Sequence, residues 1–159
     1  RRTSPSAPTS TSTAGNTSGA NPESVRAFVD TGALLALSRQ KDQHHARAID
    51  IAERHLGAGG QFIGTTLILA EFHSHLLYLR GPKAARVAVS ALLGDPVHEW
   101  LPVSSDLERE AVTRWLARFA DQEFSLIDAV SFEVMRRNKV ARAFTFDRHF
   151  AIAGFGLLA

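Results

Sequence analysis

Four carboxylate residues stand where strands end or helices begin. Asp30 follows the apolar run Ala27-Phe28-Val29, Asp147 follows "AFTF", Glu71 lies one turn into an apolar helix, and Asp128 lies one turn into another. Carboxylates held close together repel and raise each other's pKa. A bound divalent cation resolves that conflict, and carboxylates without thiolates favour Mg²⁺ or Mn²⁺. Such a site can activate water and neutralise charge at a phosphate during hydrolysis.

Each acid also has a structural interpretation. Asp30 can cap the helix that follows it. Asp128 is the third residue after Ser125, so the pair can form a capping box. Asp147 can be a turn residue or can pair with Arg148. Glu71 is different, because a carboxylate among apolar neighbours is costly without a partner. Capping does not explain all four positions, so the set favours function.

Histidines and cations are secondary candidates. Glu71 and His75 are four residues apart and share a helix face, which permits either a metal pair or a polar rim. His44 and His45 open a helix and are expected to be solvated. His149 can contact a phosphate.

A cationic cluster flanks the last acidic helix and strand. It can attract a phosphate backbone, or it can be an ordinary solvated helix end. Its members are Arg136, Arg137, Lys139, Arg142 and Arg148.

The elements that must position these side chains alternate along the chain. Strands are predicted at 26–30, 61–66, 98–103, 141–147 and 154–159. Helices are predicted at 31–38, 42–56, 67–79, 82–94, 105–120 and 125–138. This alternation predicts a parallel α/β sheet covered on both faces. Ligands of such sheets bind outside the carboxyl ends of the strands, which is where the four acids fall.

Composition sets the remaining limits. The chain has 159 residues, a 45% hydrophobic content and no cysteine, which excludes disulfides and thiolate metal sites. The formal charge of +2 permits nucleic acid as a partner without demanding it. Residues 1–24 are rich in Ser, Thr and Pro, and we interpret them as a disordered tail or linker. Residues 25–159 form the predicted domain, and no apolar run is long enough to span a membrane.

Four segments together resemble one family. In order, "FVDTGALLAL", "TTLILAEF", "FSLIDAVSFEVM" and "AFTFDRHF" are similar to motifs of the PIN-domain nucleases, and most similar to the VapC-like toxins of bacterial toxin–antitoxin systems. The resemblance covers about residues 26–159. It implies a three-layer α/β/α sandwich with a central parallel sheet of four to five strands. The Ser/Thr-rich leader departs from many family members.

The resemblance also implies an activity and a site. The implied activity is cleavage of RNA that depends on Mg²⁺ or Mn²⁺. Asp30, Glu71, Asp128 and Asp147 match the family's acidic positions, with Asp30, Asp128 and Asp147 as metal ligands. Thr31 and Thr145 match its supporting hydroxyl residues. RNA contacts are expected from Arg136, Arg137, Arg148 and His149.

We therefore expect a cytoplasmic, metal-dependent endoribonuclease that is the toxin of a toxin–antitoxin pair. A cognate antitoxin should bind across the groove, and a homodimer should form through the apolar helices at 67–79 and 82–93. Two alternatives stay open. One is a binding module without catalysis on the same fold, and the other is a small-molecule metallophosphatase.

Overall fold

Five parallel strands form the centre of the protein. The computed structural model describes residues 26–158, so the tail predicted for residues 1–24 lies outside the described residues. The strands are β1 (Arg26–Val29), β2 (Gln61–Thr65), β3 (His98–Leu101), β4 (Arg142–Phe144) and β5 (Gly156–Leu157). Their order across the sheet is β3-β2-β1-β4-β5, and every neighbouring pair is parallel. The predicted α/β class and strand number are confirmed.

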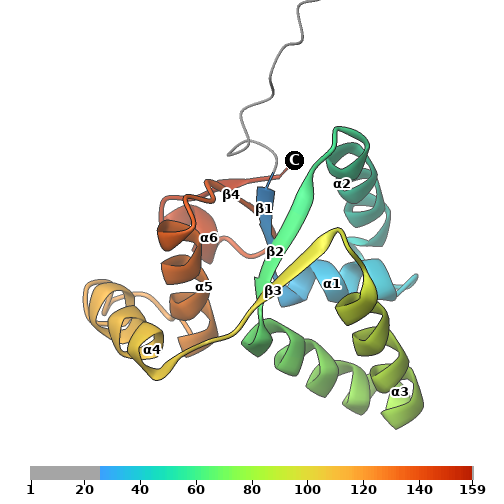
Figure 1. The fold of residues 1–159 in the computed structure, drawn as a ribbon, viewed down its shortest axis with the longest axis horizontal. Coiled ribbons are helices and arrows are strands. Elements are labelled where there is room, and N and C mark those ends of the chain that lie inside the picture. Colours follow the sequence, from blue (N-terminus) through green and yellow to red (C-terminus); the bar gives the residue numbers. More distant parts are fainter. Residues whose placement is uncertain (1–25, 159) are drawn as a thin grey trace, which may run out of the picture.

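Helices cover the sheet in two groups (Figure 1). One group contains α1 (Thr31–Ser38), α2 (His45–Gly57) and α3 (Thr66–Gly94). The other contains α4 (Ser105–Ala111), α5 (Leu126–Arg137) and the short α6 (His149–Ile152). The core between the layers includes Phe28, Ile63 and Phe144, which are completely buried. The three layers agree with the predicted sandwich.

The central strand β1 places Asp30 at the carboxyl edge of the sheet, where the site lies. Phe28 is in register with Ile63 on one side and with Ala143 on the other. Because all strands are parallel, the residues that follow β1, β2 and β4 emerge at the same edge. Asp30 is the first residue after β1, and its backbone N–H still donates to Phe144 of β4 at 3.1 Å.

Helix α3 contains a break. The sequence predicts two helices, at 67–79 and 82–94, and the structure joins them across Gly81, which has φ 81° and ψ 173°. Such a positive φ is accessible to glycine at little cost. The following Pro82 then starts the second half, where a missing N–H is tolerated. The two halves therefore present different surfaces of one long element.

The helix predicted at 105–120 ends earlier than expected. It comprises α4 and the π-helical turn η2 (Val112–Leu116), in which the Ala117 N–H donates to the Val112 carbonyl, five residues back. The turn carries Trp115, which is buried, toward α5. Its indole N–H donates to Glu133 at 3.2 Å.

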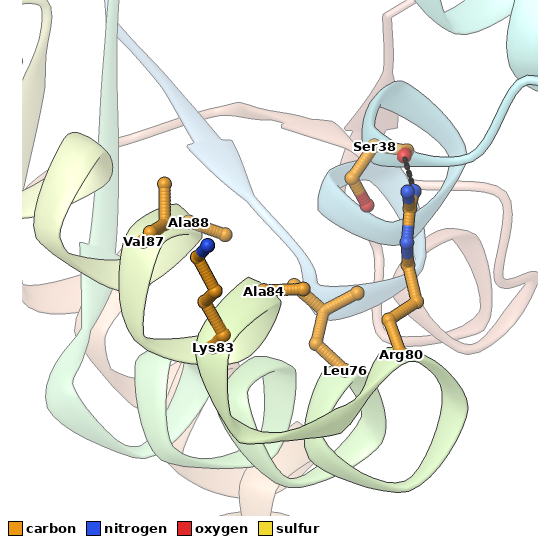
Figure 2. A pocket seen from close by; sticks show the side chains of 7 residues that line it. All are labelled: Ser38, Leu76, Arg80, Lys83, Ala84, Val87 and Ala88. Carbon is orange, nitrogen blue, oxygen red and sulfur yellow. Dashed lines mark hydrogen bonds between the residues drawn. The ribbon is translucent and has the colours of Figure 1, made fainter.

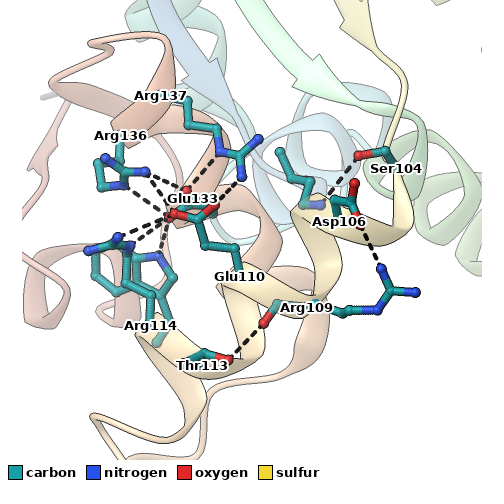
Figure 3. Close-up of polar contacts among 11 residues, drawn as sticks. Ser104, Asp106, Arg109, Glu110, Thr113, Arg114, Glu133, Arg136 and Arg137 are labelled. Carbon is teal, nitrogen blue, oxygen red and sulfur yellow. Dashed lines mark hydrogen bonds and ion pairs between the residues drawn. The ribbon is translucent and has the colours of Figure 1, made fainter.

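Glu133 is the polar centre of the contact between these helices (Figure 3). Its side chain has no exposed surface, and its carboxylate accepts from Arg136 at 2.7 Å and from Arg137 at 2.9 Å. Arg114 of η2 lies 3.4 Å away, and Glu110 of α4 pairs with all three arginines. This network fastens η2 and α4 to the carboxyl-terminal half of α5.

Within residues 26–158, no helix combines the length and the apolar character that crossing a membrane needs.

Candidate active site

The four predicted acids line one cleft at the carboxyl edge of the sheet. The cleft has a volume of about 410 Å³, and α1, α3, α5 and the segment after β4 contribute its walls. Its lining residues are Asp30, Thr31, Gly32, Leu35, Glu71, His75, Ser125, Asp128, Phe146 and Asp147. Acids that are 117 residues apart in the chain thus meet, as the parallel sheet predicts.

Asp30 is a half-buried acid at the end of β1. Its carboxylate accepts a hydrogen bond from the Thr145 hydroxyl at 2.9 Å. Burial raises its pKa to about 6, helped by the nearby charges of Asp128 and Glu71 and opposed by hydrogen bonds from Thr145 and Thr31. Asp30 occupies the N-cap position of α1, but its side chain makes no capping hydrogen bond. The capping interpretation of its carboxylate is therefore wrong.

Glu71 reaches the cleft from α3. The Thr31 hydroxyl donates to its carboxylate at 2.5 Å, so the partner that an acid in an apolar helix needs is a neighbouring site residue. Thr31 is the first residue of α1 and orients Glu71. His75 lines the same cleft one turn later, and its ring nitrogen contacts the Glu71 carbonyl at 3.0 Å.

Asp128 serves the helix and the cleft together. Ser125 accepts from the Asp128 N–H at 3.0 Å, and Asp128 Oδ2 accepts from the Ser125 N–H at 2.7 Å, which completes a capping box. The capping-box interpretation of Asp128 is therefore confirmed, and it does not exclude a role for the same side chain in the acidic site. Asp128 Oδ1 has no hydrogen-bond partner within residues 26–158 and remains available to a ligand.

Asp147 is held by backbone and side-chain contacts. Its N–H donates to the Thr145 hydroxyl at 3.0 Å, and its Oδ1 accepts from the His149 N–H at 2.9 Å. The turn interpretation is thus confirmed. In the described part of the chain Asp147 forms no ion pair with Arg148, which is exposed beside it.

His149 points toward the carboxylates. Its Nδ1 lies 3.3 Å from Asp147 Oδ2 and 3.7 Å from Asp128 Oδ2, and it is buried without a hydrogen bond of good geometry. Its ring packs edge-on against Phe124. The three side chains bring ligand atoms within 4.8 Å of one another. The predicted phosphate contact of His149 stays a prediction.

The donor set suits a divalent cation. Four carboxylates share one cleft, desolvation raises the pKa of Asp30, and the unsatisfied buried Nδ1 of His149 faces Asp128 and Asp147. Mutual repulsion and desolvation make this arrangement unfavourable until a cation neutralises it. Oxygen ligands without thiolates are typical of sites for hard divalent cations.

The structure gives two of the predicted RNA-binding arginines protein partners. Arg136 and Arg137 lie in the last turn of α5 and pair with Glu110 and Glu133. Arg137 is nine residues after Asp128, roughly 13 Å along the helix axis. Arg148 is exposed and directly follows Asp147, so it is closer in sequence to a cleft residue than Arg136 and Arg137 are.

Aromatic residues at the cleft are absent from the sequence prediction. Phe146 lines the cleft, and the ring of His44 stacks on it with centroids 4.3 Å apart and planes 7° apart. The expectation that His44 is simply solvated is wrong, because Phe146 covers one face of its ring. No local pattern could reveal this pair, since its members are 102 residues apart.

The sheet order and the four-acid cleft define the class of protein. The chain belongs to the PIN-domain family, because the family model for the PIN domain matches residues 27–156. Among curated proteins, it is 35% identical over 130 residues to the 23S rRNA-specific endonuclease VapC20 of Mycobacterium tuberculosis, covering 80% of this chain and 94% of VapC20. It is 27% identical over 133 residues to a VapC ribonuclease of Archaeoglobus fulgidus, covering 83% of each.

Solved structures agree with this assignment. The crystal structure of VapC20, a toxin that cleaves the sarcin–ricin loop, has a TM-score of 0.69 at 34% identity and covers 80% of this chain and 95% of that one. FitAcB from Neisseria gonorrhoeae has a TM-score of 0.57 at 15% identity, covers 83% of this chain and 96% of that one, and supports the fold alone. The predicted resemblance to VapC-type ribonuclease toxins is confirmed.

Proposed function

We propose that this chain hydrolyses RNA phosphodiester bonds with Mg²⁺ or Mn²⁺ held by Asp30, Asp128 and Asp147, while Glu71 helps to position the ion or a water. The observation that carries the proposal is the meeting of all four acids in one cleft. PIN-domain nucleases use divalent metal ions, and such an ion would activate water and neutralise phosphate charge. Within the chain, Thr145 orients Asp30 and Thr31 orients Glu71.

The substrate class that we propose is ribosomal RNA, at a loop of the sarcin–ricin type. The support is the relative VapC20, which is named for that activity and is 35% identical over most of both chains. A cytoplasmic location follows from that substrate. A small-molecule phosphatase would need only the ion and the cleft, whereas an RNA nuclease also needs contacts along a strand.

The experiment is cleavage of cellular RNA after induced expression, with the new 5′ ends mapped. Wild type should cut at a discrete rRNA position. Asp30→Asn removes one negative ligand and should lower the rate at least 100-fold, as should Asp128→Asn, which keeps an oxygen for the Ser125 N–H. His73→Ala is the matched control, because the His73 side chain makes no hydrogen bond within residues 26–158 and is outside the cleft lining.

Three outcomes would contradict the proposal, and two of them would favour an alternative. If the Asp30→Asn protein cuts RNA as fast as wild type, the metal mechanism is wrong. RNA binding that is indifferent to EDTA and to both Asn variants, without any cleavage, would favour a non-catalytic module. Faster turnover of a small phosphoester than of RNA would favour the phosphatase.

We also propose that an antitoxin docks in a hollow of about 500 Å³ that is lined by residues of α1 and α3 (Figure 2). Glu71 and His75 line the cleft, and the next turns of α3 line the hollow. Its residues are Ser38, Leu76, Arg80, Lys83, Ala84, Val87 and Ala88. The apolar floor and two cations suit a partner segment that carries apolar and acidic side chains. Val87→Asp should abolish toxin neutralisation, because it places a charge on the apolar lining of the hollow. Cleavage should persist, because Val87 is 53% exposed and the fold tolerates a polar side chain there.

A homodimer is proposed through α3. Large apolar side chains of this helix are exposed, and Tyr78 is 90% exposed. The same helix exposes three leucine side chains, which are Leu77, Leu79 and Leu93, at 43%, 44% and 61% exposure. Such surfaces mark association sites in soluble proteins. Light scattering after size exclusion should give twice the monomer mass for wild type. The Tyr78→Glu variant should have the mass of a monomer. A monomeric wild type at high concentration would contradict the proposal.

A further inference from the structure

The stacked pair of His44 and Phe146 stands at the rim of the catalytic cleft. Phe146 lies between Thr145 and Asp147, two residues of the site, and itself lines the cleft. His44 comes from the segment between α1 and α2, and its ring is parallel to Phe146 within 7° at a centroid distance of 4.3 Å. Both side chains are only partly buried. A flat pair of rings is therefore offered next to the carboxylates.

The pair is held in place from both sides. The His44 N–H donates to Asp42 Oδ1 at 2.9 Å, and the ring of the next residue, His45, contacts the Ala36 carbonyl of α1 at 2.7 Å. Phe146 packs edge-on against Phe144, which is completely buried, at 6.2 Å and 69°. The rings consequently have a fixed orientation relative to β4 and α1.

Cations stand on both sides of His44 in the chain. Lys41 and Arg47 are exposed, and neither has an ion-pair partner within residues 26–158. Arg39 instead pairs with Asp42 at 3.4 Å. Aromatic rings interleaved with free cations are the usual means by which proteins hold single-stranded nucleic acid, since bases stack and phosphates pair with charge.

We propose that His44 and Phe146 form a stacking subsite for one nucleobase of the RNA, with Lys41 and Arg47 on the neighbouring phosphates. The proposal rests on the proposed ribonuclease function. An unpaired base stacked on the solvent-facing side of this pair fixes one nucleotide at the rim. The adjoining backbone is thereby directed over the carboxylates. Stacking of this kind tolerates different bases, so it positions the strand rather than reading its sequence.

Fluorescence of 2-aminopurine tests stacking directly, because this base loses emission when it stacks. The protein is the full chain carrying Asp30→Asn, so that RNA is bound and not cut. The probes are a hairpin with a sarcin–ricin loop sequence and an unstructured oligonucleotide, each labelled at one loop or strand position in turn. We expect quenching at one position of at least one probe and none with His44→Ala.

Three substitutions of His44 separate stacking from other roles. His44→Ala should weaken RNA binding by about 5- to 100-fold, the range for loss of one stacked base. His44→Phe keeps the flat ring and should bind nearly as wild type, whereas His44→Gln keeps polarity and should bind as weakly as Ala. His73→Ala is the matched histidine control and Arg86→Ala the matched cation control for Lys41→Ala. Both controls are exposed or half-exposed residues of α3.

The results overturn the proposal in defined ways. If His44→Gln binds and His44→Phe does not, the contact is a hydrogen bond and stacking is wrong. If all His44 variants bind and quench as wild type, the pair only packs the loop. These outcomes leave the nuclease proposal intact when wild type still cleaves RNA, whereas absence of cleavage by wild type refutes that proposal independently of fluorescence.

Discussion

The hydroxyl of Thr145 lies 2.9 Å from Asp30 Oδ2 and donates a hydrogen bond to it. The Thr145 hydroxyl oxygen also accepts a hydrogen bond from the N–H of Asp147 at 3.0 Å. One buried side chain therefore joins the acid that follows β1 to the acid that follows β4. Because both hydrogen bonds use a single hydroxyl, the separation of two proposed metal ligands depends on residue 145.

We predict that Thr145→Val weakens metal binding about 10- to 100-fold, the usual effect of removing a group that orients a ligand. Valine has nearly the same shape as threonine but lacks the hydroxyl, so Asp30 and the Asp147 N–H both lose a partner. Thr145→Ser keeps the hydroxyl and should stay close to wild type. Calorimetric titration with Mn²⁺ measures the dissociation constant, and equal constants for Val and Ser would contradict this role.

Asp30 should reduce the stability of the metal-free protein. Its pKa is raised from 3.8 to about 6, chiefly by burial, so folding disfavours its ionised form. This cost is full above pH 6 and disappears as the pH falls toward 3.8. Asp30→Asn should therefore raise the free energy of unfolding in EDTA at pH 7.5, by at most about 3 kcal/mol.

Urea unfolding of both proteins at pH 7.5 and pH 4.5 checks this prediction. The gain from Asp30→Asn should shrink at the lower pH, and it should shrink or reverse when Mn²⁺ is added to wild type. A variant that is less stable than wild type at both pH values would show that the carboxylate stabilises the fold.

Glu133 should have the opposite effect on stability. Burial would raise its pKa, but hydrogen bonds from Arg136, Arg137 and Trp115 lower it from 4.5 to about 2. Its contribution is therefore complete above pH 4.5 and is lost as the pH falls toward 2. Wild type should exceed Glu133→Gln in unfolding free energy at pH 7, and that difference should decrease by about 3 kcal/mol between pH 5 and pH 2.

The comparison of wild type with Glu133→Gln contains its own control, because all other carboxylates titrate in both proteins. Unfolding by urea at several pH values gives the difference. A difference that does not change with pH would mean that folding does not shift the pKa of Glu133. Nuclease activity at pH 7 should be retained in any Glu133→Gln protein that remains folded, since Glu133 is not in the cleft lining.

His149 should supply a nitrogen ligand beside two carboxylates. Its Nδ1 lies 3.3 Å from Asp147 and 3.7 Å from Asp128 and has no hydrogen-bond partner within residues 26–158. We predict that His149→Ala weakens Mn²⁺ binding by about tenfold or more, because the ion loses a ligand atom that lies within 4.8 Å of the two acids. Calorimetric titration checks it, with His73→Ala as control. An unchanged dissociation constant would limit His149 to packing against Phe124.

Much of the fold was predictable because its signals are local. The apolar run before Asp30 and the Gly81-Pro82 break each indicate an element or its end, and the structure has both. The acids were predictable as a group, since parallel strands bring their carboxyl ends to one edge. Cap details are less evident in the sequence: two serines precede Asp106, and only the structure shows that Ser104 caps α4 by accepting from the Leu107 N–H.

Contacts between distant segments were beyond the sequence pattern. The pairing of Arg136 and Arg137 with Glu110 depends on how η2 packs against α5. The stack of His44 on Phe146 depends on the position of a loop. Charge and aromatic character are visible in a sequence, but whether a side chain is already occupied by a protein partner is a tertiary property.

Asp128 and Asp30 differ in how strongly the presence of each acid in a chain indicates nuclease activity. Asp128 closes a capping box, so folding alone gives a chain reason to keep it even after nuclease activity is lost. Asp30 makes no cap and carries a pKa that desolvation raises, so a chain without use for an ion would become more stable by replacing it. In a lineage free to drift, Asp30 would be the first of these acids to disappear, and its presence is the stronger sign of an active enzyme.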